Sequence, residues 1–166
     1  MEGWGKTGVE GWENGRRPRP PSASLSPMSD LSVRHATPSD IDAVLLFWRT
    51  AAEGTSISDD RDGVARLLDR DPEALLLAER EGVLLGTVIA GFDGWRCHAY
   101  RLAVHPDHRR QGIARALLDS AEQRFVALGG RRSDAMVLEA NERAHRAWEA
   151  SGYHREDHWR RWVKPL

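Results

Sequence analysis

The sequence has little cysteine, little lysine and no long apolar run. Cys97 is the only cysteine among 166 residues, which excludes a disulfide framework and a zinc site built from several cysteines. No stretch of about 18 apolar residues is present, so no membrane-spanning helix is expected. With 24 basic and 25 acidic residues, the net charge of -1 gives no long-range attraction to nucleic acid or an anionic membrane. We therefore expect a cytoplasmic protein with neither as a partner.

The basic residues are almost all arginine, with only Lys6 and Lys164 as lysines. We attribute this excess to a GC-rich coding sequence, so an arginine carries functional meaning only where its position is special. A chain of this length buries roughly 70% of its unfolded surface, which provides a core without metals or disulfides.

Residues 1–28 are rich in Gly, Pro and Ser and lack the apolar run of a signal peptide. This composition predicts a disordered N-terminal extension. Met28 stands where regular patterning begins, and we interpret it as the native start, with residues 1–27 as mis-assigned upstream sequence. Peptides from residues 1–27 in the native protein would contradict this interpretation.

From residue 31 onward, hydrophobic periodicity predicts one domain, residues 31–166, in which strands and helices mix. The predicted strands are Leu31–Ala36, Ala74–Arg80, Val83–Phe92, Arg96–Val104, Ala135–Leu138 and a final strand region, Tyr153–Val163. Helices are predicted to begin at Pro38 and to span about residues 60–70, 112–128 and 141–150. Hairpins combined with crossover helices imply a single sheet of the α/β (α+β) class.

The stretch of residues 101–118 joins a strand end to a helix that starts with glycine. Pro106 prevents the strand from continuing past Val104, and the long helix begins at Gly112. Gly112 and the small Ala114 leave backbone N–H groups exposed where the helix dipole is positive, so a diphosphate could bind there. Three arginines flank this turn and could neutralise the diphosphate: Arg109, Arg110 and Arg115.

Two motifs occur in a fixed order in this region. Leu102–Pro106 leads into R-x-x-G-x-A at Arg109–Ala114, and N-x-x-A…G-Y runs from Asn141 to Tyr153. Together they resemble the GNAT superfamily of acetyl-CoA-dependent N-acetyltransferases, over about residues 31–166. The resemblance implies a mixed, mostly antiparallel sheet flanked by helices. Its fourth and fifth strands, about residues 97–104 and 134–139, would splay apart to admit the cofactor.

The resemblance also implies acetyl-CoA as co-substrate, with no metal. The backbone of the fourth strand would pair with the pantetheine arm, amides of the loop would hold the diphosphate, and Asn141 would bond the pantetheine region. The implied cofactor-binding residues are Leu102, Ala103, Val104, Arg109, Arg110, Gln111, Gly112, Ile113, Ala114, Arg115, Asn141 and Trp148.

The residues that handle protons are less well marked. Many relatives carry a tyrosine in the last helix as general acid, and Trp148 occupies that position here. Trp148 then packs against pantetheine or simply closes the core, and Tyr153 is interpreted as a core residue. For the base we favour His98, which matches the strand position of a catalytic glutamate in histone-type relatives. Tyr100, on the same strand face, is the second candidate for either role; an ordinary strand role for both stays open.

The predicted function is transfer of an acetyl group from acetyl-CoA to the amine of an unidentified acceptor, a small molecule or a peptide or protein. The rival interpretation is a CoA-binding GNAT-like sensor or partner module without turnover. Asp59, Asp60 and Asp62 are interpreted either as an acidic rim that attracts a cationic amine or as charges at a helix N-terminus. The oligomeric state is left open, with a homodimer as one alternative.

Overall fold

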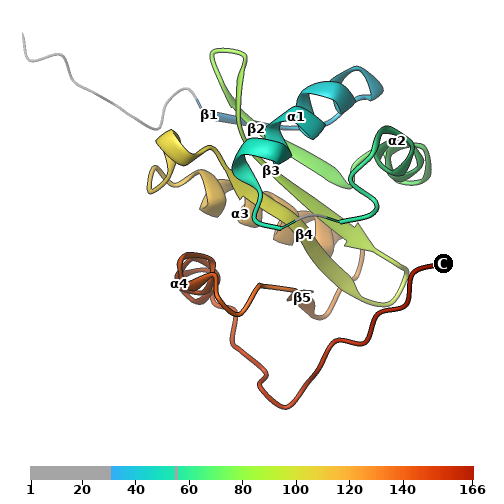
Figure 1. Ribbon diagram of the computed structural model, residues 1–166, viewed down its shortest axis with the longest axis vertical. Helices are drawn as coiled ribbons and strands as arrows, with labels where there is room; N and C mark the ends of the chain where they lie inside the picture. Colours follow the sequence, from blue (N-terminus) through green and yellow to red (C-terminus); the bar gives the residue numbers. More distant parts are fainter. Residues whose placement is uncertain (1–30, 55) are drawn as a thin grey trace, which may run out of the picture.

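The computed structural model describes residues 31–54 and 56–166 (Figure 1). The predictions on residues 1–28 and on Met28 lie outside these residues. The strands are β1 (Leu31–His35), β2 (Leu75–Arg80), β3 (Val83–Phe92), β4 (Cys97–Val104) and β5 (Ser133–Ala135). The helices are α1 (Ile41–Ala51), α2 (Arg61–Arg70), α3 (Ile113–Ala127) and α4 (Glu142–Ala150), with 3₁₀ turns at Pro38–Asp40 and Pro106–His108. Across the described ranges, every helix is too short or too polar to cross a bilayer.

The strands form one open sheet in the order β1-β2-β3-β4-β5. Neighbouring strands from β1 to β4 run antiparallel, and β5 runs parallel to β4. The sheet is therefore mixed and mostly antiparallel, which confirms the predicted fold class. The β2–β3 turn was also predicted correctly: Glu81 and Gly82 both have positive φ, of 52° and 76°, as a tight hairpin turn requires.

Helices cover both faces of the sheet (Figure 1). α3 packs on one face, where its apolar residues Ile113, Leu117, Ala121 and Phe125 are buried together with Trp148 of α4. α1 and α2 pack on the other face over Leu75 and Leu77 of β2. In α1 the buried residues include Phe47, while Leu45 is only partly buried.

Gly86 lets α3 lie directly on β3. A β-carbon at Gly86 would stand 2.8 Å from Ile113 Cγ2 and 2.9 Å from Leu117 Cδ1. Both distances are shorter than ordinary contact between carbon atoms. The absence of a side chain at this position therefore sets how closely the first two turns of α3 approach the sheet.

A β-bulge interrupts the pairing of β3 with β4. Thr87 pairs with Ala103 and Ile89 pairs with Tyr100. Two residues of β4, Arg101 and Leu102, therefore lie opposite the single β3 residue Val88. Arg101 has a φ of 52°, an uncommon conformation for a residue with a side chain. The bulge bends β4 just after Ala99, where its pairing with β5 ends.

Two predictions for the C-terminal part were wrong. β5 begins at Ser133 rather than at Ala135 and ends after three residues. Residues 153–163 form no strand, because a strand needs a partner edge and β5 is too short to provide one. The segment is also densely charged, and its large apolar side chains Trp159 and Trp162, which would point to opposite faces of a strand, are exposed.

Candidate active site

A wedge between β4 and β5 forms the centre of the site. β5 pairs with β4 only from Cys97 to Ala99, so the remainder of β4, up to Val104, has no strand on that side among the described residues. This confirms the splayed strands implied by the resemblance. Leu102, Ala103 and Val104 line the resulting cleft, where their backbone groups can bind an extended ligand as another strand would.

The N-terminus of α3 has no side-chain cap, in contrast to the starts of α2 and α4. Asp60 accepts a hydrogen bond from the Gly63 N–H at the start of α2, and Asn141 accepts one from Ala144 at the start of α4. Gly112, with a φ of 79°, offers α3 no such acceptor, and no acidic residue lies in its first turn. The first N–H groups of α3 therefore have no side-chain acceptor at the positive end of the helix dipole.

The arginines of the loop hold different positions. Arg109 donates from Nε to the carbonyl oxygen of Val104 at 3.3 Å, which ties the loop to the end of β4. Arg110 has a φ of 60°. Arg115 forms an exposed ion pair with Asp119, one turn further along α3. All three line the cleft, as do Gly112, Ile113 and Ala114.

Gln111 departs from this pattern. Its side-chain oxygen accepts a hydrogen bond from Arg80 at 3.0 Å, and Gln111 is absent from the residues that line the cleft. Arg80 lies at the end of β2, beside the hairpin turn. The Gln111 side chain therefore anchors the loop from outside the cleft.

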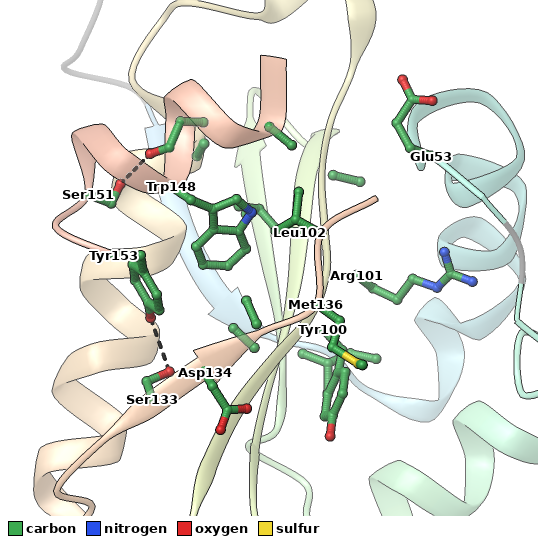
Figure 2. A pocket seen from close by; sticks show the side chains of 18 of the residues that line it. Glu53, Tyr100, Arg101, Leu102, Ser133, Asp134, Met136, Trp148, Ser151 and Tyr153 are labelled. Atoms are coloured by element: carbon green, nitrogen blue, oxygen red, sulfur yellow. Dashed lines mark hydrogen bonds between the residues drawn. The ribbon is translucent and has the colours of Figure 1, made fainter. Parts of the chain in front are cut away.

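On the far side of the wedge, Trp148 of α4 forms the wall. Its ring is buried and meets that of Tyr153 edge-on, with centroids 4.7 Å apart. Figure 2 shows Trp148 between Leu102 and Tyr153, whose hydroxyl donates to Ser133 Oγ at 3.1 Å. Burial raises the pKa of the Tyr153 phenol. The geometry of Tyr153 is that of a packed, hydrogen-bonded residue, in keeping with the core role predicted for it.

His98 and Tyr100 lie together on the opposite side of β4. Their rings stack with centroids 5.7 Å apart. His98 Nδ1 lies 2.5 Å from a carboxylate oxygen of Asp134 on β5, and Nε2 lies 3.8 Å from Asp93. Tyr100 lines the cleft, whereas His98 does not. Burial, followed by the nearby carboxylates of Asp134 and Asp93, raises the pKa of the Tyr100 phenol, which therefore stays protonated at neutral pH.

A sequence profile described as the Acetyltransferase (GNAT) family matches residues 42–153. The chain belongs to the GNAT acetyltransferase family. It is 35% identical to Acetyltransferase YE1169 of Yersinia enterocolitica over 127 residues, which span 76% of this chain and 90% of that protein.

Solved GNAT structures share the fold. AAC(6')-Iy, solved with a bisubstrate analogue, matches with a TM-score of 0.67 at 17% identity, over 83% of this chain and all of that chain. The protein yncA of Salmonella typhimurium, solved with its cofactor acetyl-CoA, matches with a TM-score of 0.61 at 20% identity, over 75% and 80% of the two chains. This GNAT chain therefore has the same fold as these two solved structures.

Sequence reasoning missed one pair in the site. Asp59 forms an ion pair with Arg101 of β4, and Asp60 caps α2. The helix-terminus interpretation of the acidic cluster is therefore correct for Asp60, and the charge of Asp59 is neutralised rather than presented to a ligand. No motif marks this pair, because its two residues lie 42 positions apart in the sequence.

Proposed function

We propose that this protein transfers an acetyl group from acetyl-CoA to the amine of an acceptor. The wedge between β4 and β5 beside the uncapped start of α3 carries this proposal. Such a wedge offers unpaired backbone groups to an extended arm, and the helix start offers N–H groups to an anion. Both features lie along one cleft, as a ligand with a diphosphate at one end and an extended arm at the other requires.

The residues of this chain fit acetyl-CoA. N–H groups from Gly112 to Arg115 would hold the diphosphate, with Arg109, Arg110 and Arg115 to balance its charge. Backbone groups of Leu102–Val104 would pair with the pantetheine arm. The side-chain oxygen of Asn141 accepts a hydrogen bond from the Ala144 N–H, so its NH₂ group is the part that would donate to that arm. When bound, acetyl-CoA supplies an activated thioester.

In this proposal His98, which does not itself line the cleft, takes the proton of the attacking amine through a bridging water. A protonated Nδ1 donates to Asp134, which fixes the tautomer and leaves Nε2 with a free lone pair. The amine nitrogen forms a bond to the acetyl carbon, the carbon–sulfur bond breaks, and the thiolate takes up a proton. Tyr100, which lines the cleft and remains protonated, is the donor that the structure offers for that last step. A backbone N–H near Val104 would donate to the carbonyl oxygen.

The test is thiol release from acetyl-CoA, followed across a panel of small amines and peptides. We expect release that depends on one class of amine. Tight CoA binding without turnover on any amine would instead favour a CoA-binding sensor, a role with which the tryptophan at position 148 is compatible, because indole does not ionise in the useful range.

Variants separate the two proton-handling residues. His98→Ala should lower turnover by about 10-fold or more between about pH 6 and 9, because the imidazole is the group that accepts the proton of the amine. Tyr100→Phe should lower turnover at every pH by about 10-fold or more. Unchanged turnover of His98→Ala throughout this pH range would remove His98 from the mechanism.

A further inference from the structure

Arg101 links the β4 bulge to the loop between α1 and α2. Its Nε donates to Asp59 Oδ1 at 2.9 Å, a second guanidinium nitrogen donates to the other carboxylate oxygen, and Nη1 donates to the carbonyl of Gly54 at 3.2 Å. The side chain of Arg101 is only 14% exposed and that of Asp59 only 20%. Two parallel hydrogen bonds fix the orientation of both partners, which a lysine could not do.

A second set of contacts holds Arg101 in place. Its guanidinium lies over the ring of Trp48 of α1, 5.7 Å from the centroid. The indole N–H of Trp48 donates to the hydroxyl of Thr87, and that hydroxyl donates to the carbonyl of Arg101, each at 2.9 Å. Thr87 is fully buried. The bulge backbone, the α1 helix and the Arg101 side chain therefore form one closed set of interactions.

The tethered loop reaches across the cleft. A β-carbon at Gly54 would stand 3.4 Å from Leu138 Cδ1, in the segment after β5. Figure 2 shows Arg101 extending away from Leu102 and Trp148, towards the side of the cleft where Glu53 lies. Gly54, Asp59 and Arg101 all line the cleft, so the loop and its tether form part of the cleft wall.

We propose that Arg101 is a positioning residue for the acceptor: its ion pair with Asp59 holds the α1–α2 loop against the β4 bulge and so fixes one wall of the acceptor pocket. This inference rests on the proposed function. It assigns the Arg101 side chain no contact with acetyl-CoA, whose expected ligands are the backbone of Leu102–Val104 and the start of α3. It also explains why an arginine is kept at a φ of 52°, where its side chain gains partners that offset the backbone strain.

The test uses three variants that separate the backbone from the side chain. Arg101→Asn tolerates positive φ but removes the tether. Asp59→Asn removes the charge partner, and Arg101→Lys keeps the charge without the paired hydrogen bonds. With the best amine from the panel above, we expect KM for the amine to rise about 10-fold or more in the first two variants and less in the third. KM for acetyl-CoA should stay within about twofold of the wild-type value, because the diphosphate loop is untouched.

The matched control is Arg61→Gln. Arg61 also joins the two helices, through an ion pair with Asp42, but both side chains are more than half exposed, so KM for either substrate should not change. Equal rises of both KM values in Arg101→Asn, or an unchanged amine KM, would overturn the proposal. If Arg101→Asn and Asp59→Asn do not fold, Arg101→Lys carries the same test.

A second readout does not need an acceptor. Hydrogen–deuterium exchange of amides in residues 52–54 and 56–60 should speed up in Arg101→Asn and Asp59→Asn, while amides of α3 keep wild-type rates. Unchanged exchange in the loop would overturn the tether itself. If the wild type shows no turnover on any amine, the proposed function fails, while this exchange experiment still decides whether the tether orders the loop.

Discussion

Replacing Gly86 by alanine tests how the sheet positions the diphosphate loop. The new β-carbon would meet Ile113 Cγ2 at 2.8 Å, Leu117 Cδ1 at 2.9 Å and the Ala103 carbonyl at 3.1 Å. Carbon atoms pack best at about 3.5–4.0 Å, so α3 has to retreat by roughly half an ångström or more. Ile113 and Leu117 are both fully buried, which leaves them no free space into which to turn.

This strain should affect both stability and binding. Overpacking of a well-filled core costs about 1–3 kcal/mol, which corresponds to a Tm lower by roughly 3–10 °C in a domain of this size. Because Ile113 is the first residue of α3, the same retreat moves the N–H groups at the start of the helix, which would donate hydrogen bonds to the diphosphate. We expect CoA affinity to fall about 3- to 10-fold, since displacements well under 1 Å already weaken such contacts.

The assays are thermal unfolding and calorimetric titration with CoA. Gly91→Ala is the matched control on the same strand, because its β-carbon would meet the nearest atoms, in Tyr100 and His98, at ordinary distances of 3.5 and 3.6 Å. That variant should keep wild-type Tm and CoA affinity. If Gly86→Ala retains wild-type CoA affinity while Tm falls, the link between the Gly86 contact and the diphosphate loop is refuted.

Three further predictions address charge. Asp40→Asn should lower the free energy of unfolding by about 1–2 kcal/mol, because Asp40 accepts hydrogen bonds from Arg34. Arg34 holds the pKa of Asp40 well below its usual value. This stability is therefore present above the unfolded-state pKa of Asp40 and is lost as pH falls through its folded-state pKa. The free energies of unfolding of wild type and variant, measured by urea titration, should converge in acid. Asp134→Asn should lower kcat with little change in KM for acetyl-CoA, and an unchanged kcat would remove Asp134 from the orientation of the base. Arg109→Gln should raise KM for acetyl-CoA most strongly at low salt, whereas Arg49→Gln, on the exposed side of α1, should not.

Local sequence patterns predicted the elements that depend on local rules. The Glu81-Gly82 turn, the β3 strand from Val83 to Phe92 and the buried stripe of α3 follow from turn chemistry and hydrophobic periodicity. A helical turn also begins at Pro38 as predicted, but Pro38–Asp40 is a 3₁₀ turn and α1 itself begins at Ile41. Such features need no knowledge of what lies across the molecule.

Features that depend on distant partners could not be read in the same way. The β4 bulge at Arg101 carries no glycine or asparagine to mark it, since the strain is offset by Asp59, Trp48 and Gly54 from another part of the chain. The expected strand at residues 153–163 does not form, because pairing depends on an edge that the three-residue β5 does not offer. In the site, the motif correctly predicted the uncapped start of α3, but nothing in it indicated that Gln111 turns away to Arg80.

The most direct test of the central claim follows the acetyl group itself. Acetyl-CoA labelled with ¹³C in the acetyl carbonyl would be incubated with the protein and the amine panel, and the products examined by mass spectrometry and NMR. The account predicts one labelled acetyl group in amide linkage per acceptor amine, formed at a rate that depends on enzyme and amine together. Labelled acetate alone, or no product despite tight CoA binding, would contradict acetyl transfer to an amine.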